Sequence, residues 1–279
     1  MIAEFAASWP LFHNAYLSGW LIGVLLALTG VGVVARNQIF IGAAVAQAST
    51  LGIALGMWVG AALGEPFSTE HAHGALSFVG VLFAVAAALL TAGAREGAHE
   101  ATTGWVFLAC ASLAILVLAH SPHGLEEINH LVSSSIIGAT RADVWLFGGL
   151  AALAAAAVLA ARERIILFAV DPAMAAAVGM RTVRWRAGLA AWLGLVVGLS
   201  MRATGLLYTF GCLVLPVLVA IALCRETRAL FLVAPAVALA TGIAGFVLAN
   251  HFDDPPGQMT VALQSVALAA AWVVRLRRR

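Results

Sequence analysis

The sequence predicts an all-α polytopic membrane protein with a single transmembrane domain over residues 1–279. Two observations predict this fold class. Hydrophobic residues make up 63% of the chain and charged residues only 10%, with a mean hydropathy of +1.01, which excludes a soluble domain of this length. The apolar residues are also gathered into nine long runs separated by short polar connections. A helix of about 20 apolar residues crosses a hydrocarbon core of roughly 30 Å, so we expect each run to be one span of a lipid bilayer.

The predicted spans lie, in order, at residues 11–35, 43–63, 74–94, 101–119, 144–161, 187–204, 205–224, 229–250 and 259–274. The runs at 144–161 and 259–274 are short for a crossing, and eight spans result if one of them is re-entrant. The first arginine is Arg36, so the N-terminal region lacks the basic residues of a secretory signal. We therefore expect the first run to be a retained helix.

Arginine residues occupy alternate connections and predict the orientation of the chain. If the N-terminus is outside and the C-terminus is cytoplasmic, 13 of the 15 arginines lie on inner connections, namely Arg36, Arg95, Arg162, Arg164, Arg181, Arg184, Arg186, Arg225, Arg228, Arg275, Arg277, Arg278 and Arg279. Seven of the eight histidines then lie outside, namely His13, His71, His73, His120, His123, His130 and His251. Arginine-rich short connections stay in the cytoplasm, so we predict a multi-pass protein of the bacterial inner membrane. The basic residues have this topological role, and we expect no nucleic acid partner.

The composition excludes two classes of site. The chain has 15 arginines and no lysine, so it has neither the lysine of a P-loop nor the amine of a Schiff-base enzyme. Energy for any work must therefore come from another chain or from an ion gradient. Cys110, Cys212 and Cys224 lie inside apolar runs without a pairing or zinc-binding spacing, and we interpret them as small buried apolar residues.

Glycines recur at helical spacing in two of the runs. Gly52, Gly56 and Gly60 occupy every fourth position of the second run, and Gly194 and Gly198 do so in the sixth. Small residues on one face let membrane helices approach closely, so this spacing predicts tight packing of both helices. The alternative is the abundance of glycine alone, since the chain has 27 glycines.

Two inner segments have the features of helices at the cytoplasmic surface. Residues 171–179 contain an N-cap (Asp171), a proline at the first helical position (Pro172) and a glycine stop (Gly179), which together predict a short interfacial helix. Pro216 is expected to break the seventh run. Its inner half then becomes a separate helix that leads into the charged connection 224–228.

These segments resemble the membrane permeases of zinc- and manganese-type ABC transporters. The matching blocks follow one order along the chain: residues 32–36 with Gly42, Ala48 and Gly52; Ile137, Gly138 and Asp143; Asp-Pro-x-x-Ala-x-x-x-Gly at 171–179; Gly205-Leu206-Leu207 with Pro216 and Ala220; and Asp253-x-Pro255-x-Gly257. The resemblance implies the membrane subunit of a bacterial importer, without enzymatic activity or a stably bound cofactor, whose cargo is Zn²⁺ or Mn²⁺. It also implies a homodimer, two copies of a separate ATPase and an extracytoplasmic metal-binding protein. The segment 216–228, with Pro216, Arg225, Glu226 and Arg228, would dock into the ATPase.

Residues 42–48 depart from the family pattern at a metal-binding position. The second span of the family commonly carries Gly-Asp-Ala-x-x-His-Ala, with the Asp and the His one helical turn apart. In this chain Ala43 replaces the carboxylate and Gln47 replaces the imidazole. Divalent metal ions prefer carboxylate oxygen and imidazole nitrogen. The ion is therefore handled elsewhere along the path, or the cargo is not a bare ion.

An outer connection offers a replacement ligand set, which we call the outer triad: His123, Glu127 and His130. In a helix that starts near residue 121, the triad shares one face at i, i+4 and i+7, and two imidazoles with a carboxylate suit Zn²⁺. The alternative is a solvated polar face. The loop 65–73 contains an H-x-H and either gathers metal, docks the binding protein or is a plain hydrophilic loop. Asp253 and Asp254 are expected to form a turn before the last span.

Other classes of membrane protein remain as alternatives. A secondary transporter needs ionisable residues inside its spans, where only Arg202, near an outer end, is found. An intramembrane enzyme needs a nucleophile–base pair or a metal motif within the membrane, and the runs contain none. A permease for metal chelates, of the siderophore or cobalamin kind, is a closer alternative. The changes at Ala43 and Gln47 favour it, whereas chain length and the 205–220 block favour the metal-ion family.

Overall fold

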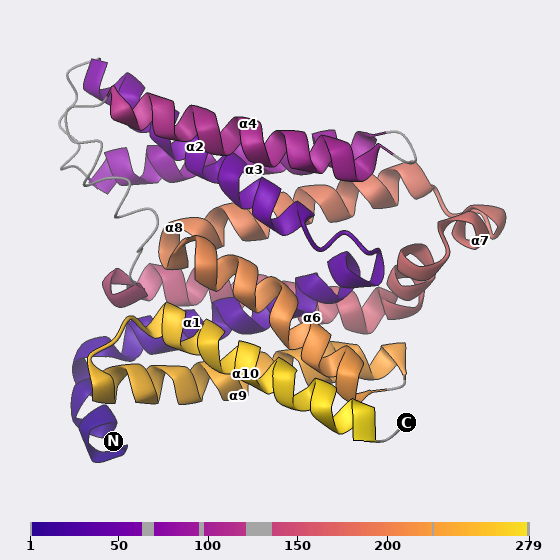
Figure 1. Cartoon of the computed structure of the whole chain (residues 1–279). Coiled ribbons are helices and arrows are strands. Elements are labelled where there is room, and N and C mark those ends of the chain that lie inside the picture. The colour runs from indigo at the N-terminus through magenta and orange to yellow at the C-terminus, as the bar shows by residue number, and fades with distance from the viewer. Residues whose placement is uncertain (1, 63–69, 95–97, 121–135, 225, 278–279) are drawn as a thin grey trace. The chain divides into compact units, whose positions relative to one another are not determined.

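The computed structural model describes residues 2–62, 70–94, 98–120, 136–224 and 226–277, and every element of secondary structure among them is helical. The α-helices, shown in Figure 1, are α1 (Ile2–Ala35), α2 (Ile41–Ala62), α3 (Glu70–Gly93), α4 (His99–Ala119), α6 (Arg141–Val170), α7 (Pro172–Ala177), α8 (Thr182–Leu223), α9 (Thr227–Phe252) and α10 (Pro256–Arg277). A short 3-10 helix, η1 (Ile136–Gly138), precedes α6. The predicted all-α fold is confirmed.

Seven of the described helices are long and apolar enough to cross a bilayer: α1, α2, α4, α6, α8, α9 and α10. In α3, residues Phe78–Gly93 form a shorter apolar helix. The two runs that are short in the sequence belong to longer helices, since α6 has 30 residues and α10 has 22. At about 1.5 Å per residue, both exceed a hydrocarbon core of roughly 30 Å. α6 gains its first turn from a capping box, in which the Thr140 and Asp143 side chains bond each other's backbone N–H groups.

Helix α8 is twice as long as a single crossing requires. Its 42 residues span about 63 Å if straight. The backbone leaves the helical conformation at Gly205, where φ is 74° and ψ is 179°, a combination that residues with a Cβ rarely adopt. This break lies at the predicted boundary between the runs 187–204 and 205–224. Each half of α8 therefore corresponds to one predicted span.

The helix break predicted at Pro216 is wrong. Gly205 is the non-helical position inside α8, the helix continues to Leu223, and Pro216 is buried. Pro216 has no N–H to donate to the preceding turn, but close packing from α1 supports the helix there. A Cβ on Gly30 of α1 would collide with the carbonyl oxygen of Leu213. Proline is tolerated in membrane helices when neighbouring helices hold the backbone in this way.

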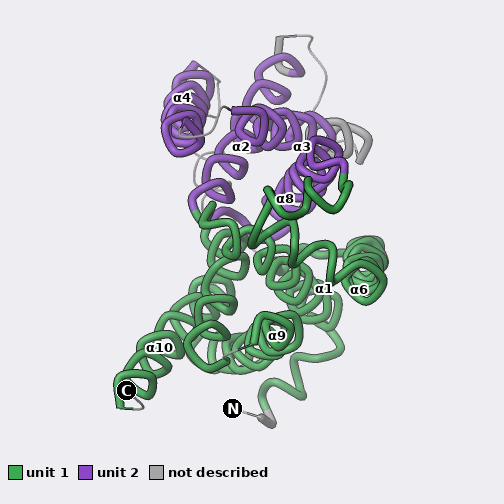
Figure 2. The backbone as a smooth tube through the Cα atoms, turned by 90° about the vertical axis from the view of Figure 1, so that its right-hand side faces the viewer, with its two compact units in different colours: residues 1–39, 135–180, 207–279 green, residues 40–134, 181–206 purple. Residues whose placement is uncertain are grey.

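The chain forms two compact units, coloured separately in Figure 2. Unit 1 consists of residues 1–39, 135–180 and 207–279, and unit 2 consists of residues 40–134 and 181–206. The chain passes between them several times, so neither unit is a continuous stretch of sequence. The single transmembrane domain over residues 1–279 stays a prediction.

Unit 1 is built around α1. This helix packs against α6 and α9, and α9 packs against α10. Buried apolar residues of α1, α8 and α9, such as Val31, Val217 and Ala234, form one cluster. Two hydrogen bonds add polar links between helices. The Tyr208 hydroxyl donates to the carbonyl oxygen of Gly19 over 2.8 Å, and Gln264 Nε2 donates to Cys212 Sγ over 3.3 Å. Cys212 is buried as predicted, whereas Cys110 and Cys224 are half-buried.

Unit 2 is held together by close contacts at glycines. α2 packs against α3 and α4. A Cβ at Gly52 would lie 2.8 Å from the carbonyl oxygen of Val79, and one at Gly194 would lie 2.5 Å from the Cα of Val85. One at Gly198 would lie 2.9 Å from the backbone of α3. The predicted close packing is therefore confirmed at these three glycines.

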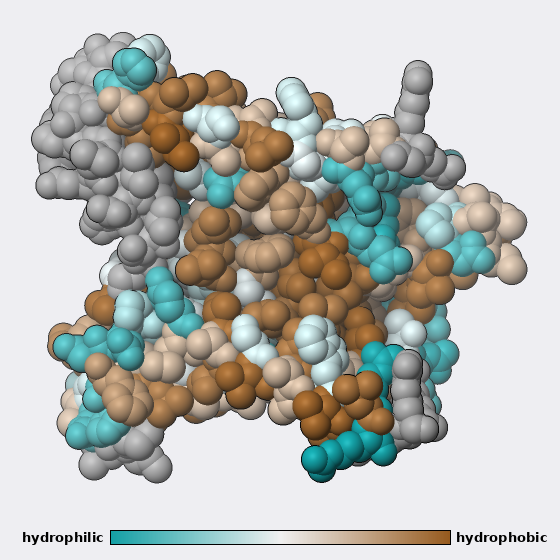
Figure 3. Space-filling model, viewed as in Figure 1, coloured by the Kyte–Doolittle hydropathy of each residue, from teal (hydrophilic) through white to brown (hydrophobic). Residues whose placement is uncertain are grey.

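Large hydrophobic side chains remain exposed along several helices. The most exposed ones on α4, α6 and α10 include Trp105, Leu108, Trp145, Leu159, Val266 and Leu276. In Figure 3 the surface along α10 is mostly hydrophobic, with hydrophilic residues at its C-terminal end. Water does not accommodate an apolar surface of this extent on a monomer, whereas the hydrocarbon core of a bilayer does.

Candidate functional site

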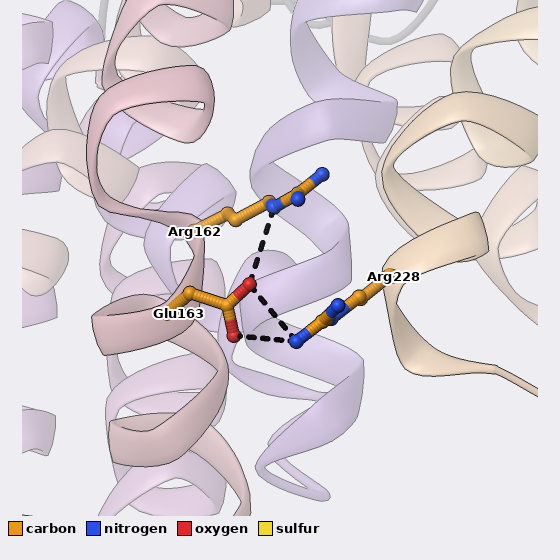
Figure 4. Close-up of polar contacts among 3 residues, drawn as sticks. All are labelled: Arg162, Glu163 and Arg228. Carbon is orange, nitrogen blue, oxygen red and sulfur yellow. Dashed lines mark hydrogen bonds and ion pairs between the residues drawn. The ribbon is translucent and has the colours of Figure 1, made fainter.

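One end of unit 1 carries a cluster of one carboxylate and two guanidinium groups, which we call the Glu163 cluster (Arg162, Glu163 and Arg228; Figure 4). Arg228 Nη2 lies 3.1 Å from Oε1 and 3.2 Å from Oε2 of Glu163. Arg162 Nε lies 3.4 Å from the same Oε1. The three side chains are 47–61% exposed. The cluster joins α6, which carries Arg162 and Glu163, to α9, which carries Arg228.

Local structure explains why a carboxylate is needed beside Arg228. α9 begins at Thr227, after Glu226, an N-cap residue whose side chain makes no capping hydrogen bond. Arg228 therefore lies in the first turn of a helix, where unpaired backbone N–H groups and the helix dipole disfavour a cation. Glu163 supplies negative charge at this position. It reaches Arg228 because α6 stays helical to Val170, well past the end of its predicted span.

The same end of α6 is held against α1. The guanidinium carbon of Arg36 lies 5.1 Å from the centre of the Phe168 ring, which is within the range of a cation–π interaction. Phe168 is buried. Just after α1, Asn37 adopts a φ of 55° and turns the chain. The ends of α1, α6 and α9 therefore meet at one place, which we call the arginine-rich end of unit 1.

Helix α7 follows α6 directly and shares a residue with its end. The N–H of Asp171 donates to the carbonyl oxygen of Leu167 over 2.9 Å and closes α6. Oδ1 of Asp171 accepts from the N–H of Met174 over 2.9 Å and caps α7. Pro172 occupies the first turn, and Gly179 has the positive φ of a stop signal, 84°. The short helix predicted at 171–179 is confirmed.

The surface of α7 is largely open. Ala175 is the buried residue of this helix. Figure 1 shows α7 projecting away from α6. Met174 and Val178, one turn apart, are 52% and 61% exposed. A small apolar surface is thus presented at the arginine-rich end of the unit.

The opposite end of unit 1 contains a cavity of about 120 Å³, which we call the aromatic pocket. It is lined by the aromatic residues Phe12, Tyr16 and Phe246, two isoleucines of η1, Asn250, Asp253 and Asp254. The Tyr16 hydroxyl donates to Asn250 Oδ1 over 3.3 Å. Nearby, His251 Nδ1 lies 2.8 Å from Glu4 Oε2. Acidic residues beside aromatic rings create an environment that attracts cations.

At the two positions where the family carries metal ligands, this chain has one apolar side chain and one amide. Ala43 and Gln47 lie one turn apart on α2, as predicted; Ala43 is 7% exposed and Gln47 is half-buried. An amide oxygen is the remaining ligand there. Across the residues that the structure describes, no three His, Cys, Asp or Glu side chains are grouped so that they could hold a metal ion.

Comparison with known proteins identifies the family. The sequence model of the ABC 3 transport family matches residues 8–275. The chain belongs to the ABC 3 transport family. The chelated iron transport system membrane protein YfeD of Yersinia pestis is 23% identical over 267 residues, which cover 95% of this chain and 86% of that protein. The manganese import system permease protein ScaB of Streptococcus gordonii is 21% identical over 282 residues, which cover 100% of this chain and 98% of that one.

A solved structure supports the same assignment at the level of the fold. PsaBC from Streptococcus pneumoniae, in complex with Fab, matches with a TM-score of 0.78 at 18% identity, over 99% of this chain and 95% of that chain. The predicted resemblance to metal ABC-transporter permeases is therefore confirmed. As a member of the ABC 3 transport family with seven candidate spans among its described residues, the chain is a multi-pass permease of the bacterial inner membrane.

In this ABC 3 permease the predicted site residues have different outcomes. The outer triad, Arg225 and residues 63–69 lie outside the described residues. Pro216 is buried within α8, whereas Arg228 is exposed on α9. The turn predicted at Asp253 is confirmed by its left-handed φ of 59°, which ends α9. Asp253 also lines the aromatic pocket.

Sequence reasoning missed two of the features that organise the ABC 3 permease. Glu163 was one, although a signal existed: it is an acidic residue between Arg162 and Arg164, where topology alone requires only positive charge. The hydrogen bond between Tyr16 and Asn250 was the other. It joins residues 234 positions apart, and no pattern within a short stretch of the sequence predicts it.

Proposed function

We propose that this permease forms the translocation path of a bacterial ATP-binding-cassette importer for divalent metal ions, manganese or zinc, and that it works as a homodimer. The observation that carries the proposal is the family match over residues 8–275. A relative named as a manganese import permease aligns over the whole chain and supports the choice of cargo. The metal is cargo, and we expect no stably bound cofactor.

We infer nine crossings with the N-terminus outside and the C-terminus in the cytoplasm. Seven helices are long enough to cross; the break at Gly205 divides α8 into two crossings, and α3 supplies the ninth. Arginine-rich connections stay in the cytoplasm. The arginine-rich end of unit 1, with α7 and the Glu163 cluster, is then cytoplasmic, and the aromatic pocket faces outward.

The ATPase docks, in this proposal, on a cytoplasmic surface formed by α7 and the connection 224–228. A chain without lysine has no P-loop, so hydrolysis belongs to a separate ATPase subunit. Met174 and Val178 offer exposed apolar contacts of the kind that occupy the centre of a protein interface, and charged residues suit its rim. Arg225 and Glu226 supply that rim, whereas Arg228 is paired with Glu163 of α6. Pro216, which is buried, is no longer part of the docking surface.

An extracytoplasmic metal-binding protein delivers the ion at the outer end. Asp253 and Asp254 border the aromatic pocket there, and the outer triad belongs to the connection 120–143 on the same side. Carboxylate and imidazole ligands suit Mn²⁺ and Zn²⁺. We propose that these groups receive the ion in place of the ligands that the second span lacks.

A permease for metal chelates is the second candidate. A chelate brings its own ligands, so it does not require a carboxylate at position 43 or an imidazole at position 47, where Ala43 and Gln47 stand. A relative over 95% of the chain is named as a chelated iron transport protein.

Assembly and stimulated hydrolysis test the proposal. The permease is co-expressed with the ATPase and the extracytoplasmic binding protein of the same bacterium, purified and placed in lipid nanodiscs. Native mass spectrometry should find two permease and two ATPase subunits. Binding protein loaded with Mn²⁺ or Zn²⁺ should raise ATP hydrolysis above the level with metal-free protein. A permease that purifies without an ATPase subunit would contradict the proposal.

A pair of substitutions on α7 tests the docking surface. Met174→Ser removes an exposed apolar side chain and should weaken ATPase association. Ala176→Ser, which lies on the other side of the same helix and is also exposed, is the control and should have a smaller effect. Equal association of the two variants would exclude Met174 from the interface.

A further inference from the structure

Helices α6 and α9 are joined at one end by the Glu163 cluster while each packs on a third helix. Both pack extensively against α1, and they contact each other much less. Arg228 of α9 bonds both carboxylate oxygens of Glu163 on α6, at 3.1 and 3.2 Å. The ion pair is therefore a direct link between two helices that each pack mainly on α1.

The same end of α6 is joined to α7 by a single residue, Asp171, which caps both helices. Asp171 closes α6 with its N–H and caps α7 with its carboxylate, each over 2.9 Å. Arg36, which directly follows α1, lies over Phe168, three residues before Asp171. A displacement of α7 is thus passed to the last turn of α6, next to the Glu163 cluster.

The aromatic pocket lies at the opposite end of α9 and beside η1, the short helix that precedes α6. Ile136 and Ile137 of η1, which leads directly into α6, line it from one side. Phe246 and Asn250 of α9 line it from another. The 30 residues of α6 put about 45 Å between α7 and this pocket, and the helix between them is uninterrupted.

We propose that Glu163 is a positioning residue that makes α6 and α9 move together, so that a movement of α7 changes the aromatic pocket at the far end. This deepens the proposed function, because it assumes that the ATPase acts on α7. In this scheme Arg228 works through Glu163 and does not need to touch the ATPase. The role is coupling and not stability, since exposed ion pairs contribute little to stability.

Coupling is measured in proteoliposomes as metal taken up per ATP hydrolysed. Glu163→Gln and Arg228→Gln should each lower this ratio about two- to fivefold, the range expected for losing one exposed ion pair. The charge swap, Glu163→Arg with Arg228→Glu, should restore it when it is made together with Arg162→Gln, which removes the guanidinium that contacts position 163. Glu100→Gln and Arg164→Gln remove one exposed charge each elsewhere and should leave the ratio unchanged. ATPase association and thermal unfolding should stay near wild type in every variant.

The outcome of the charge swap decides the proposal. If the swapped chain is as impaired as the single variants, the two side chains act separately on the ATPase, and the proposal is overturned. Single variants with wild-type coupling overturn it as well. A wild-type complex without ATP-driven uptake would instead be a failure of the proposed function.

A second measurement needs neither cargo nor ATPase. Spin labels at Ala160 of α6 and Leu232 of α9, both exposed, report the separation of the two helices after the native cysteines are replaced by alanine. Glu163→Gln should broaden the distribution of label distances measured by pulsed electron resonance, and the charge swap should narrow it again. An unchanged distribution in Glu163→Gln would show that the ion pair does not hold the helices together.

Discussion

Adding one methyl group at Gly194 tests the packing of unit 2. A Cβ there would lie 2.5 Å from the Cα and 2.8 Å from the N of Val85 on α3. Ordinary contact begins at 3.4 Å, so α8 and α3 must separate by the difference, about 0.9 Å, and no side-chain rotation relieves a clash with backbone atoms. Overpacking of this kind costs about 1–3 kcal/mol, offset by about 1 kcal/mol because Ala favours a helix more than Gly does.

The matched control for Gly194→Ala is Gly188→Ala. Gly188 lies on the same helix, and nothing is within 4 Å of a Cβ added there. This control gains the helical preference alone, so the two variants should differ by about 1–3 kcal/mol in free energy of unfolding, or about 2–12 °C in apparent Tm. Heating the detergent-solubilised protein and following its monodisperse fraction by size-exclusion chromatography measures the difference. Equal apparent Tm values would refute the close approach of α8 to α3.

Three further predictions concern topology, docking and cargo. A reporter fused after Arg279 should read as cytoplasmic and one inserted at Ser68 as periplasmic; a cytoplasmic reading at Ser68 would invert or re-count the spans. Reversing the charge at both Arg225 and Glu226 should reduce uptake several-fold while the chain inserts normally, and unchanged uptake would remove this connection from the docking surface. Replacing the outer triad with alanine should lower Zn²⁺ or Mn²⁺ accumulation about tenfold or more with dimer and ATPase association intact. Wild-type accumulation of both ions would rule that site out.

The membrane fold was predictable because it depends on properties that act along the sequence. The length of an apolar run is matched to bilayer thickness, and this is why the boundary expected near residue 205 coincides with the break at Gly205. The capping of α7 is local too: Asp171, Pro172 and Gly179 act within one or two turns. Each of these residues has the role in the structure that its position predicts.

The parts that could not be predicted depend on how helices pack. Glu163 and Arg228 are 65 residues apart, and their pairing follows from the separate packing of α6 and α9 on α1. The sequence predicts a helix break at Pro216 because proline, considered by itself, interrupts a helix. The close approach of Gly30 to the backbone at Leu213 overrides that effect, and this contact joins segments distant in the sequence.

Transport by the complete complex in proteoliposomes tests the central claim most directly. The permease, its ATPase and the metal-binding protein are reconstituted with ATP on the ATPase side and labelled Mn²⁺ or Zn²⁺ on the other. We predict accumulation of at least one ion, which requires hydrolysable ATP and the metal-binding protein and persists when ion gradients are dissipated. Accumulation driven by an ion gradient without ATP would contradict the account. Transport of a metal chelate with neither free ion moved would keep the ABC permease but reject the proposed cargo.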